Sequence, residues 1–416
     1  MNACMTPHRI FLLVVFAMYC VSSIDWSQEP REKVSRIWSS EPPADTPFIQ
    51  SREITGLAFT GRYANYGAAD TWYPTWAGNG NLYSPWTDGK VNGVEAASWK
   101  GPKATTGYVT ILGDDPLHLS LVDAASYPDD PTPCGGRYPS GSLIYKGIWY
   151  YGTYCLYQTP GKNLNWDILG PFVGFRYSSD YGKTWHGTTH TPAHPLFSES
   201  AQIGGKIKMG VPHFVDFGRN MQNSPDGKAY LVAQGSSDAI APAREPDLSW
   251  ITANQVYLAR VKPSIRNMDR AGAYEFFGGY NLKGQAIWTK DFRRIQPLLT
   301  WKGRMGNVAV TYDAPLKKYL MAVTDGGNTV SKFNTFILES SYLTGPWALV
   351  TYMRNFGEQG YFVNFPSKFI SADGRTAWLS YSANFTNSYL HTGYKSDPVG
   401  GGYCWTLQEA LVEARK

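Results

Sequence analysis

A tight polar turn followed by an aromatic-rich run recurs five times along this chain of 416 residues. The turns lie at Gly80, Lys146, Asp226, Lys317 and Asp373. The anchor aromatic residues after these turns are separated by 59 to 89 residues, enough for a four-stranded sheet with loops. A turn-plus-strand unit that repeats at long period is typical of a β-propeller. The sequence therefore predicts five blades around a narrow axial funnel, whose mouth is the expected place for a functional site.

The composition and the distribution of turns predict one all-β domain. The chain has 42 glycines, 27 prolines and 15% aromatic residues, which favours short strands and tight turns over helices. No linker divides residues 55–405, so we expect a single five-bladed propeller there. Residues 24–54 are polar and contain prolines, and we expect an N-terminal extension that tethers the domain or lies along its outside. Residues 406–416 predict a short C-terminal helix that packs on the propeller, because Leu407 and Leu411 share one helical side.

The first 23 residues have the pattern of an export signal. His8 and Arg9 precede an apolar run from Ile10 to Val21, and two serines follow it. The run is short for a membrane span, so no span is expected after cleavage of residues 1–23. We expect a secreted or periplasmic protein and a monomer.

Charge and cysteine content argue against several partner classes. The formal net charge is +5, but lysine and arginine are scattered, so no nucleic acid partner is expected. After signal cleavage Cys134, Cys155 and Cys404 remain, which allows at most one disulfide and leaves its pairing open. There is no Cys-x-x-Cys motif, and prolines interrupt the histidine-containing segment 186–194, so neither metal nor cofactor is expected.

Several aspartates are expected to be structural. Residues 178–185 match the Asp-box pattern Ser-x-Asp-x-Gly-x-Thr-Trp, in which Asp180 would cap a peripheral turn. Asp226 and Asp373 begin Asp-Gly hairpin turns, where the backbone needs positive φ angles.

The densest polar and aromatic stretch, residues 69–89, carries the main candidates for chemistry. A hairpin at residues 79–81 would bring Asp70 and Asp88 to one face. Paired carboxylates beside aromatic rings suit glycoside cleavage, in which one acid protonates the leaving oxygen and the other attacks or activates water. Trp72 and Trp86 would then contact the sugar. The alternative is that both aspartates only cap turns.

Other candidates lie at the expected strand ends of later blades. Glu358 stands between glycines before an apolar strand and is a candidate third acid or substrate binder. Asp325 closes the fourth repeat much as Asp88 closes the first. Further candidates for substrate binding are Arg137 in a glycine-rich loop, His213 on a strand, with a buried structural histidine as its alternative, and Tyr361.

These residues give the chain a resemblance to the five-bladed propeller carbohydrate-active enzymes. Asp70, the hairpin at residues 80–83 and Asp88 resemble a bacterial family, formerly a domain of unknown function, that is associated with endo-D-arabinanase activity. That resemblance implies that Asp70 and Asp88 are a catalytic pair. A looser resemblance to the arabinanase and xylosidase propellers implies Asp70 as the base and Glu358 as the acid.

Three functions follow as hypotheses. The first is a secreted glycoside hydrolase that cleaves a pentose- or furanose-containing polysaccharide through Asp70 and Asp88. The second is a propeller polysaccharide lyase, in which His213, Arg137 and a tyrosine act beside a uronate carboxylate. The third is a glycan-binding propeller without catalysis.

Overall fold

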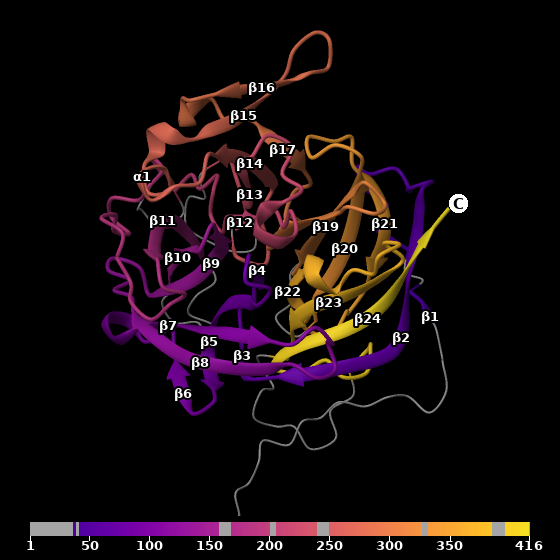
Figure 1. Cartoon of the computed structure of the whole chain (residues 1–416). Coiled ribbons are helices and arrows are strands. Elements are labelled where there is room, and N and C mark those ends of the chain that lie inside the picture. The colour runs from indigo at the N-terminus through magenta and orange to yellow at the C-terminus, as the bar shows by residue number, and fades with distance from the viewer. Residues whose placement is uncertain are drawn as a thin grey trace, which may run out of the picture.

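The computed structural model describes residues 36–38, 41–157, 168–199, 205–238, 249–326, 332–384 and 396–415. Five sheets of antiparallel strands stand in a ring around a common axis (Figure 1), which confirms the predicted five-bladed β-propeller. The predicted export segment lies outside the described residues. Within them, no helix is both long and apolar enough to cross a bilayer.

The first two blades are built from residues 68–178. The first comprises β3 (Ala68–Asp70), β4 (Thr75–Trp76), β5 (Leu82–Val91), β6 (Val94–Ala96), β7 (Thr105–Leu112) and β8 (Ser120–Pro128), with the 3-10 turn η1 (Gly101–Lys103). The second comprises β9 (Gly136–Tyr145), β10 (Ile148–Tyr157) and β11 (Ile168–Ser178).

The third and fourth blades follow in chain order. The third comprises β12 (His213–Phe214), β13 (Ala229–Gly235), β14 (Gln255–Val261), β15 (Glu275–Tyr280), β16 (Ala286–Thr289) and β17 (Pro297–Thr300), with η2 (Arg219–Met221), α1 (Ile265–Met268), η3 (Ala271–Ala273) and η4 (Phe292–Arg294). The fourth comprises β18 (Val308–Asp313), β19 (Lys318–Asp325), β20 (Asn334–Ser340) and β21 (Ala348–Met353). The β15–β16 hairpin extends the third blade away from the ring (Figure 1).

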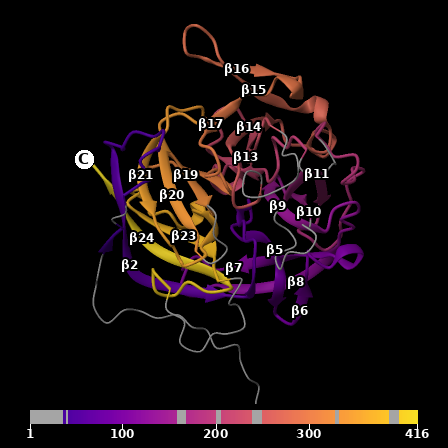
Figure 2. The same ribbon diagram turned by 180° about the vertical axis from the view of Figure 1, so that it is seen from behind.

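The fifth blade joins the two ends of the described chain. It comprises β22 (Tyr361–Asn364), β23 (Thr376–Ser382), β24 (Trp405–Ala414), β2 (Ile54–Tyr66) and β1 (Arg36–Ile37), with η5 (Ser367–Phe369). Strand β24 lies between β23 and β2, and Figure 2 shows β24 and β2 side by side from behind. The N-terminal extension contributes β1 to the outer edge of this sheet.

The predicted C-terminal helix is wrong, because residues 405–414 form strand β24. The first six residues of β24 are all buried. A central strand of a propeller blade is covered on both faces, so its sequence loses the alternation that marks a half-exposed strand. The apolar spacing at Leu407 and Leu411 therefore suggested a helix.

All five repeated turns connect the innermost strand of a blade to the second strand. Their backbones pass through the left-handed region, with φ of 94° at Gly80, 52° at Lys146, 68° at Gly227, 55° at Lys317 and 72° at Gly374. Because these turns lie at one end of every inner strand, the inner strands all begin at the opposite end of the propeller. We call that opposite end, where Asp70, Gly136 and Tyr361 lie, the entry end.

Candidate active site

Strand pairing in the first blade places the two candidate aspartates next to each other. Asp70 is the last residue of β3, and its register partner in β5 is Thr87, which precedes Asp88. The register shifts between Ala68 and Asp70, which marks a bulge in this pairing. Thr71 and Asp88 have φ angles of 62° and 51°. Such left-handed conformations are costly for residues other than glycine and occur often at functional sites.

The Asp70 carboxylate is buried and is contacted by three hydroxyl groups. Tyr361 donates a hydrogen bond of 2.8 Å to Oδ2, Tyr403 lies 3.4 Å from the same oxygen, and Thr71 donates to Oδ1 at 3.0 Å. Burial raises the pKa of Asp70 well above its usual value, and the charge of Asp88 raises it further. The three hydroxyl groups oppose this shift without cancelling it. Asp70 therefore holds its proton more tightly than an ordinary aspartic acid.

Asp88 is only partly buried. Its Oδ1 accepts hydrogen bonds from the backbone amide of Ser98 at 2.6 Å and from the Thr87 hydroxyl at 3.1 Å. Burial raises the pKa of Asp88 to about 6, against the opposing effect of the amide of Ser98, the Thr87 hydroxyl and the nearby Lys100 charge. Asp88 is thus largely ionised at neutral pH.

Asp88 lines a cleft of about 1060 Å³ at the entry end. Tyr403 lies in the same wall and donates a hydrogen bond of 2.6 Å to the backbone carbonyl of Asp88, so it touches both aspartates. Trp99 also lines the cleft, and 49% of its surface is exposed. Lys100 forms an ion pair of 2.6 Å with Glu95, and both line the cleft. The cleft therefore combines an ionised carboxylate with an exposed aromatic surface on which a sugar ring can stack.

Tyr361 is brought to Asp70, as its hydrogen bond shows, but the two predicted tryptophans are not available to a ligand. Trp72 and Trp86 each have 0% of their surface exposed. Trp72 stacks on Trp405 with ring centroids 5.5 Å apart, and Trp86 packs closely on Gly107. The prediction that Trp72 and Trp86 contact a sugar is therefore wrong, because both rings are fully buried and packed against other core residues.

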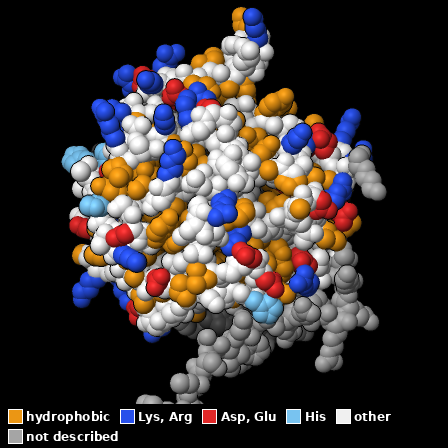
Figure 3. All heavy atoms as spheres, viewed as in Figure 1, with side chains coloured by type: hydrophobic (Ala, Val, Ile, Leu, Met, Phe, Trp, Pro, Cys, Tyr) orange, Lys and Arg blue, Asp and Glu red, His pale blue; other side chains and the backbone are white. Residues whose placement is uncertain are grey.

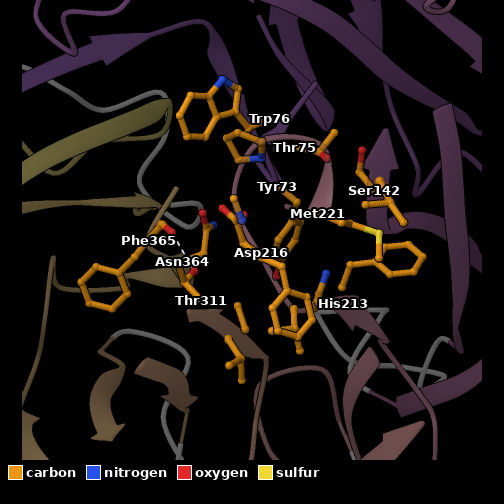
Figure 4. Close-up of a pocket in the computed structure, with 18 of the residues that line it drawn as sticks. Tyr73, Thr75, Trp76, Ser142, His213, Asp216, Met221, Thr311, Asn364 and Phe365 are labelled. Atoms are coloured by element: carbon orange, nitrogen blue, oxygen red, sulfur yellow. Dashed lines mark hydrogen bonds between the residues drawn. The ribbon is translucent and has the colours of Figure 1, made fainter. Parts of the chain in front are cut away.

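His213 lies on the propeller axis and is buried. Its ring stacks on Tyr73 at a centroid distance of 3.5 Å, and its Nε2 lies 3.3 Å from the amide nitrogen of Asn307. Burial holds the pKa of His213 well below its usual value. Figure 4 shows His213 beside a small axial pocket of about 40 Å³ that residues of all five inner strands line. This pocket is separate from the cleft beside Asp88, and its size admits water rather than a sugar.

The side chains of Arg137, Asp325 and Glu358 have partners other than Asp70 and Asp88. Arg137 is 8% exposed, and its Nε donates a hydrogen bond of 2.9 Å to Thr153. Asp325 is fully buried and receives hydrogen bonds from Arg304 at 3.1 Å and Tyr352 at 2.6 Å. Glu358 forms an ion pair of 3.2 Å with Lys332. Roles for these three residues remain predictions from the sequence.

The aspartates that were expected to be structural make local contacts. Asp180 accepts hydrogen bonds from Ser178 and from the backbone and hydroxyl of Thr184, and these bonds lower its pKa to about 2. Asp373 accepts hydrogen bonds from Ser371 and from the amide of Arg375 in its turn. No group of three or more metal-ligating side chains occurs among the described residues.

The structure adds groups that the sequence analysis did not single out. Tyr403 reaches the aspartates from the loop before β24, and Trp99 follows Ser98 into the cleft. Glu199 accepts hydrogen bonds from the amides of Lys208 and Met209, and burial raises its pKa to about 7. Of these three residues only Trp99 carried a sequence signal, because it is an aromatic residue that follows the β5–β6 hairpin.

Comparisons with known proteins give fold similarity only. No family model matches the chain, and no curated protein matches its sequence. Among solved structures, a putative hydrolase from Bacteroides ovatus is 12% identical with a TM-score of 0.47, covering 92% of this chain and 95% of that chain. An α-L-arabinofuranosidase from Podospora anserina is 12% identical with a TM-score of 0.42, covering 91% of this chain and 97% of its own. A family 117 glycoside hydrolase from Zobellia galactanivorans is 10% identical with a TM-score of 0.41, covering 92% of both chains. These values do not assign an activity to the chain.

Proposed function

We propose that this protein is a glycoside hydrolase in which Asp70 is the general acid and Asp88 is the base or nucleophile. The observation that carries the proposal is a pair of neighbouring carboxyl groups whose surroundings separate their protonation states. Burial and the charge of Asp88 favour the protonated form of Asp70, whereas Asp88, with a pKa raised to about 6, is largely ionised at neutral pH. Two carboxyl groups held in opposite protonation states are the arrangement that glycoside hydrolysis requires.

The surroundings of the pair support this division of roles. In the proposed reaction Asp70 protonates the leaving oxygen, and the Tyr361 hydroxyl group, which donates to Oδ2, stabilises the carboxylate that remains. Asp88 faces the cleft with one carboxylate oxygen held by the Ser98 amide, which fixes its orientation toward the sugar or a water molecule. Trp99 offers the stacking surface beside it.

The substrate and location are part of the proposal. We propose a pentose- or furanose-containing polysaccharide, on the resemblance of the first-blade residues to the endo-D-arabinanase family, and export through residues 1–23. The lyase alternative is less well supported, because Arg137 and His213 line two different cavities and so do not share a site.

The test is cleavage of a polysaccharide panel that includes arabinans, with new reducing ends and ultraviolet absorbance measured together. We expect reducing ends without absorbance, and a loss of about 100-fold or more in rate for Asp70→Asn and for Asp88→Asn. Asp373→Asn, which changes a turn aspartate at the far end of the propeller, is the matched control and should keep its activity. The proposal fails if both variants cleave as fast as the wild type, and an absorbing product would favour the lyase.

A further inference from the structure

A further cavity lies between the first and second blades and shares no lining residue with the cleft. Its volume is about 190 Å³, which is room for several water molecules or a small polyatomic ion. The side chains around it that bear charge or polar groups are Asp129, Arg137, Thr153, Arg176, Thr188 and His190. This cavity plays no part in the proposed hydrolysis.

Two buried guanidinium groups share one carboxylate at this cavity. Arg176 is 3% exposed and donates from Nη1 to Asp129 at 2.8 Å and from Nη2 to Thr106 at 2.9 Å. Arg137 is 8% exposed, and its Nε lies 3.6 Å from the other oxygen of Asp129. Two positive charges therefore face one negative charge where little water screens them, which is costly without a further anion.

One N–H group of the Arg176 guanidinium also lacks a hydrogen-bond acceptor within the described residues. The Nε–H of Arg176 is buried and has no hydrogen-bond partner among the described residues. The rings of Tyr151 and Tyr127 lie 3.8 and 4.4 Å from the centre of its guanidinium group and hold it in place. The guanidinium group of Arg176 is therefore held in a fixed position in the wall of the cavity.

Other acidic groups nearby are already engaged. The Asp269 carboxylate accepts hydrogen bonds from the Phe175 amide and the Thr188 hydroxyl, and lies 3.9 Å from His190. The Asp130 carboxylate accepts from the Thr132 amide in its own turn. Within the described part of the chain neither carboxylate lies within 4 Å of a nitrogen of Arg137 or Arg176, and the charge of Arg137 is the last of the effects that lower the pKa of Asp130.

We propose that this inter-blade cavity is a binding site for a small monoanion, either a halide or a carboxylate. One negative charge balances the excess positive charge of Arg137, Arg176 and Asp129. The bound ion would link strand β8 of the first blade to strands β9, β10 and β11 of the second.

The test uses the full-length purified protein in sodium HEPES without chloride. Sodium chloride or sodium acetate is added while ionic strength is held constant, and the midpoint of thermal unfolding is measured. Because a ligand that binds only the folded state stabilises it by mass action, the midpoint should rise with anion concentration. A response to chloride alone identifies a halide site, and a response to acetate identifies a carboxylate site. No response to either anion overturns the proposal.

Variants of the cavity residues and soaking with bromide test whether the anion binds in this cavity. Arg137→Gln should weaken the anion response about tenfold or more, and Arg137→Lys, which keeps the charge but loses the planar fork, should weaken it less. Arg260→Gln is the matched control, because Arg260, like Arg137, lies near a carboxylate, that of Glu275, but it does not line this cavity. Crystals soaked in sodium bromide give a readout that needs no variant to fold. Anomalous signal between Arg137 and Arg176 supports the proposal if chloride is active, whereas an unchanged anion response in Arg137→Gln contradicts it.

Discussion

Asp70 and Asp88 are neighbours in one sheet, but their hydrogen bonds differ in origin. Asp70 is held by side-chain hydroxyl groups that come from the fifth blade, whereas Asp88 is held mainly by a backbone amide of its own blade. Backbone contacts are independent of side-chain identity, so Asp88 would keep its position when its charge is removed. The effect of its charge on stability can therefore be measured separately from its proposed role in catalysis.

Asp88→Asn should make the protein more stable at neutral pH. The pKa of Asp88 is raised from 3.8 to about 6 by folding, so the folded state binds the proton more tightly than the unfolded state. Wild-type stability is therefore lost as pH rises from about 4 to about 6, and the variant should avoid this loss, gaining about 1–2 kcal/mol at pH 7. Asparagine also tolerates the φ of 51° at this position. Urea unfolding at pH 4 and pH 7 measures the difference.

Asp373→Asn provides the control of opposite sign for that experiment. The hydrogen bonds from Ser371 and the Arg375 amide lower the pKa of Asp373, so its ionised form favours the folded state. Its replacement should give no stabilisation at pH 7. Equal stability of wild type and Asp88→Asn at pH 7 would show that burial of the Asp88 charge does not destabilise the folded protein.

At the scale of elements, the sequence predicted what depends on local chemistry. Turns with glycine or a positively charged residue at positive φ are local, and all five were found where predicted. The proximity of Asp70 and Asp88 also followed from a single hairpin. The buried contacts of Trp72 and Trp86 and the strand at residues 405–414 depend on packing between blades, which the order of residues along one strand does not encode.

Contacts between distant segments were also beyond the sequence. Tyr403 lies 333 positions from Asp70, and Arg176 lies 47 positions from Asp129, so neither pairing has a spacing that could reveal it. The sequence predicts Arg137 as a substrate-binding residue. Its burial and its position beside Arg176 depend on how the strands of the second blade pair, which the sequence does not show.

Gly107→Ala should destabilise the first blade. Gly107 lies in β7 opposite Trp86 of β5, and a Cβ atom there would stand 2.3 Å from the Trp86 ring. Because Trp86 is fully buried, the ring has little room to move, and overpacking of this kind costs about 1–3 kcal/mol. Thermal unfolding of the purified variant measures the loss.

Gly227→Ala is the matched comparison for Gly107→Ala. No atom lies within 4 Å of a Cβ atom built at Gly227, so only its φ of 68° is unfavourable. This substitution should cost about 1 kcal/mol. If Gly227→Ala lowered the free energy of unfolding more than Gly107→Ala, steric overlap with Trp86 would not be the main cause of destabilisation at Gly107.

At the scale of the whole molecule, two features matter: the distribution of surface charge and the pairing of strands β2 and β24, which closes the ring of blades. Figure 3 shows basic and acidic side chains interspersed over the face in view. Closure depends on the fifth blade, where strand β24 from the end of the chain pairs with β2 from its beginning. The strands of this blade are therefore separated by most of the sequence, and their pairing completes the ring.

Trp405 is the residue at which closure can be tested. Its ring is fully buried, stacks on Trp72 of the first blade and donates from Nε1 to Ser380 at 2.8 Å. It therefore joins the closing strand to both the fifth and the first blade. Trp405→Ala leaves a cavity at this junction and should lower the free energy of unfolding by about 3–5 kcal/mol.

The measurement is urea unfolding followed by far-ultraviolet circular dichroism, with Trp99→Ala as the control. Trp99 is half exposed in the cleft, so its replacement should change stability by about 0.5 kcal/mol or less. If closure couples all five blades, Trp405→Ala should shift the midpoint of a single transition, because loss at one junction weakens the whole ring. A second transition would mean that the fifth blade opens by itself, and equal midpoints for the two variants would contradict a role for Trp405 in closing the ring.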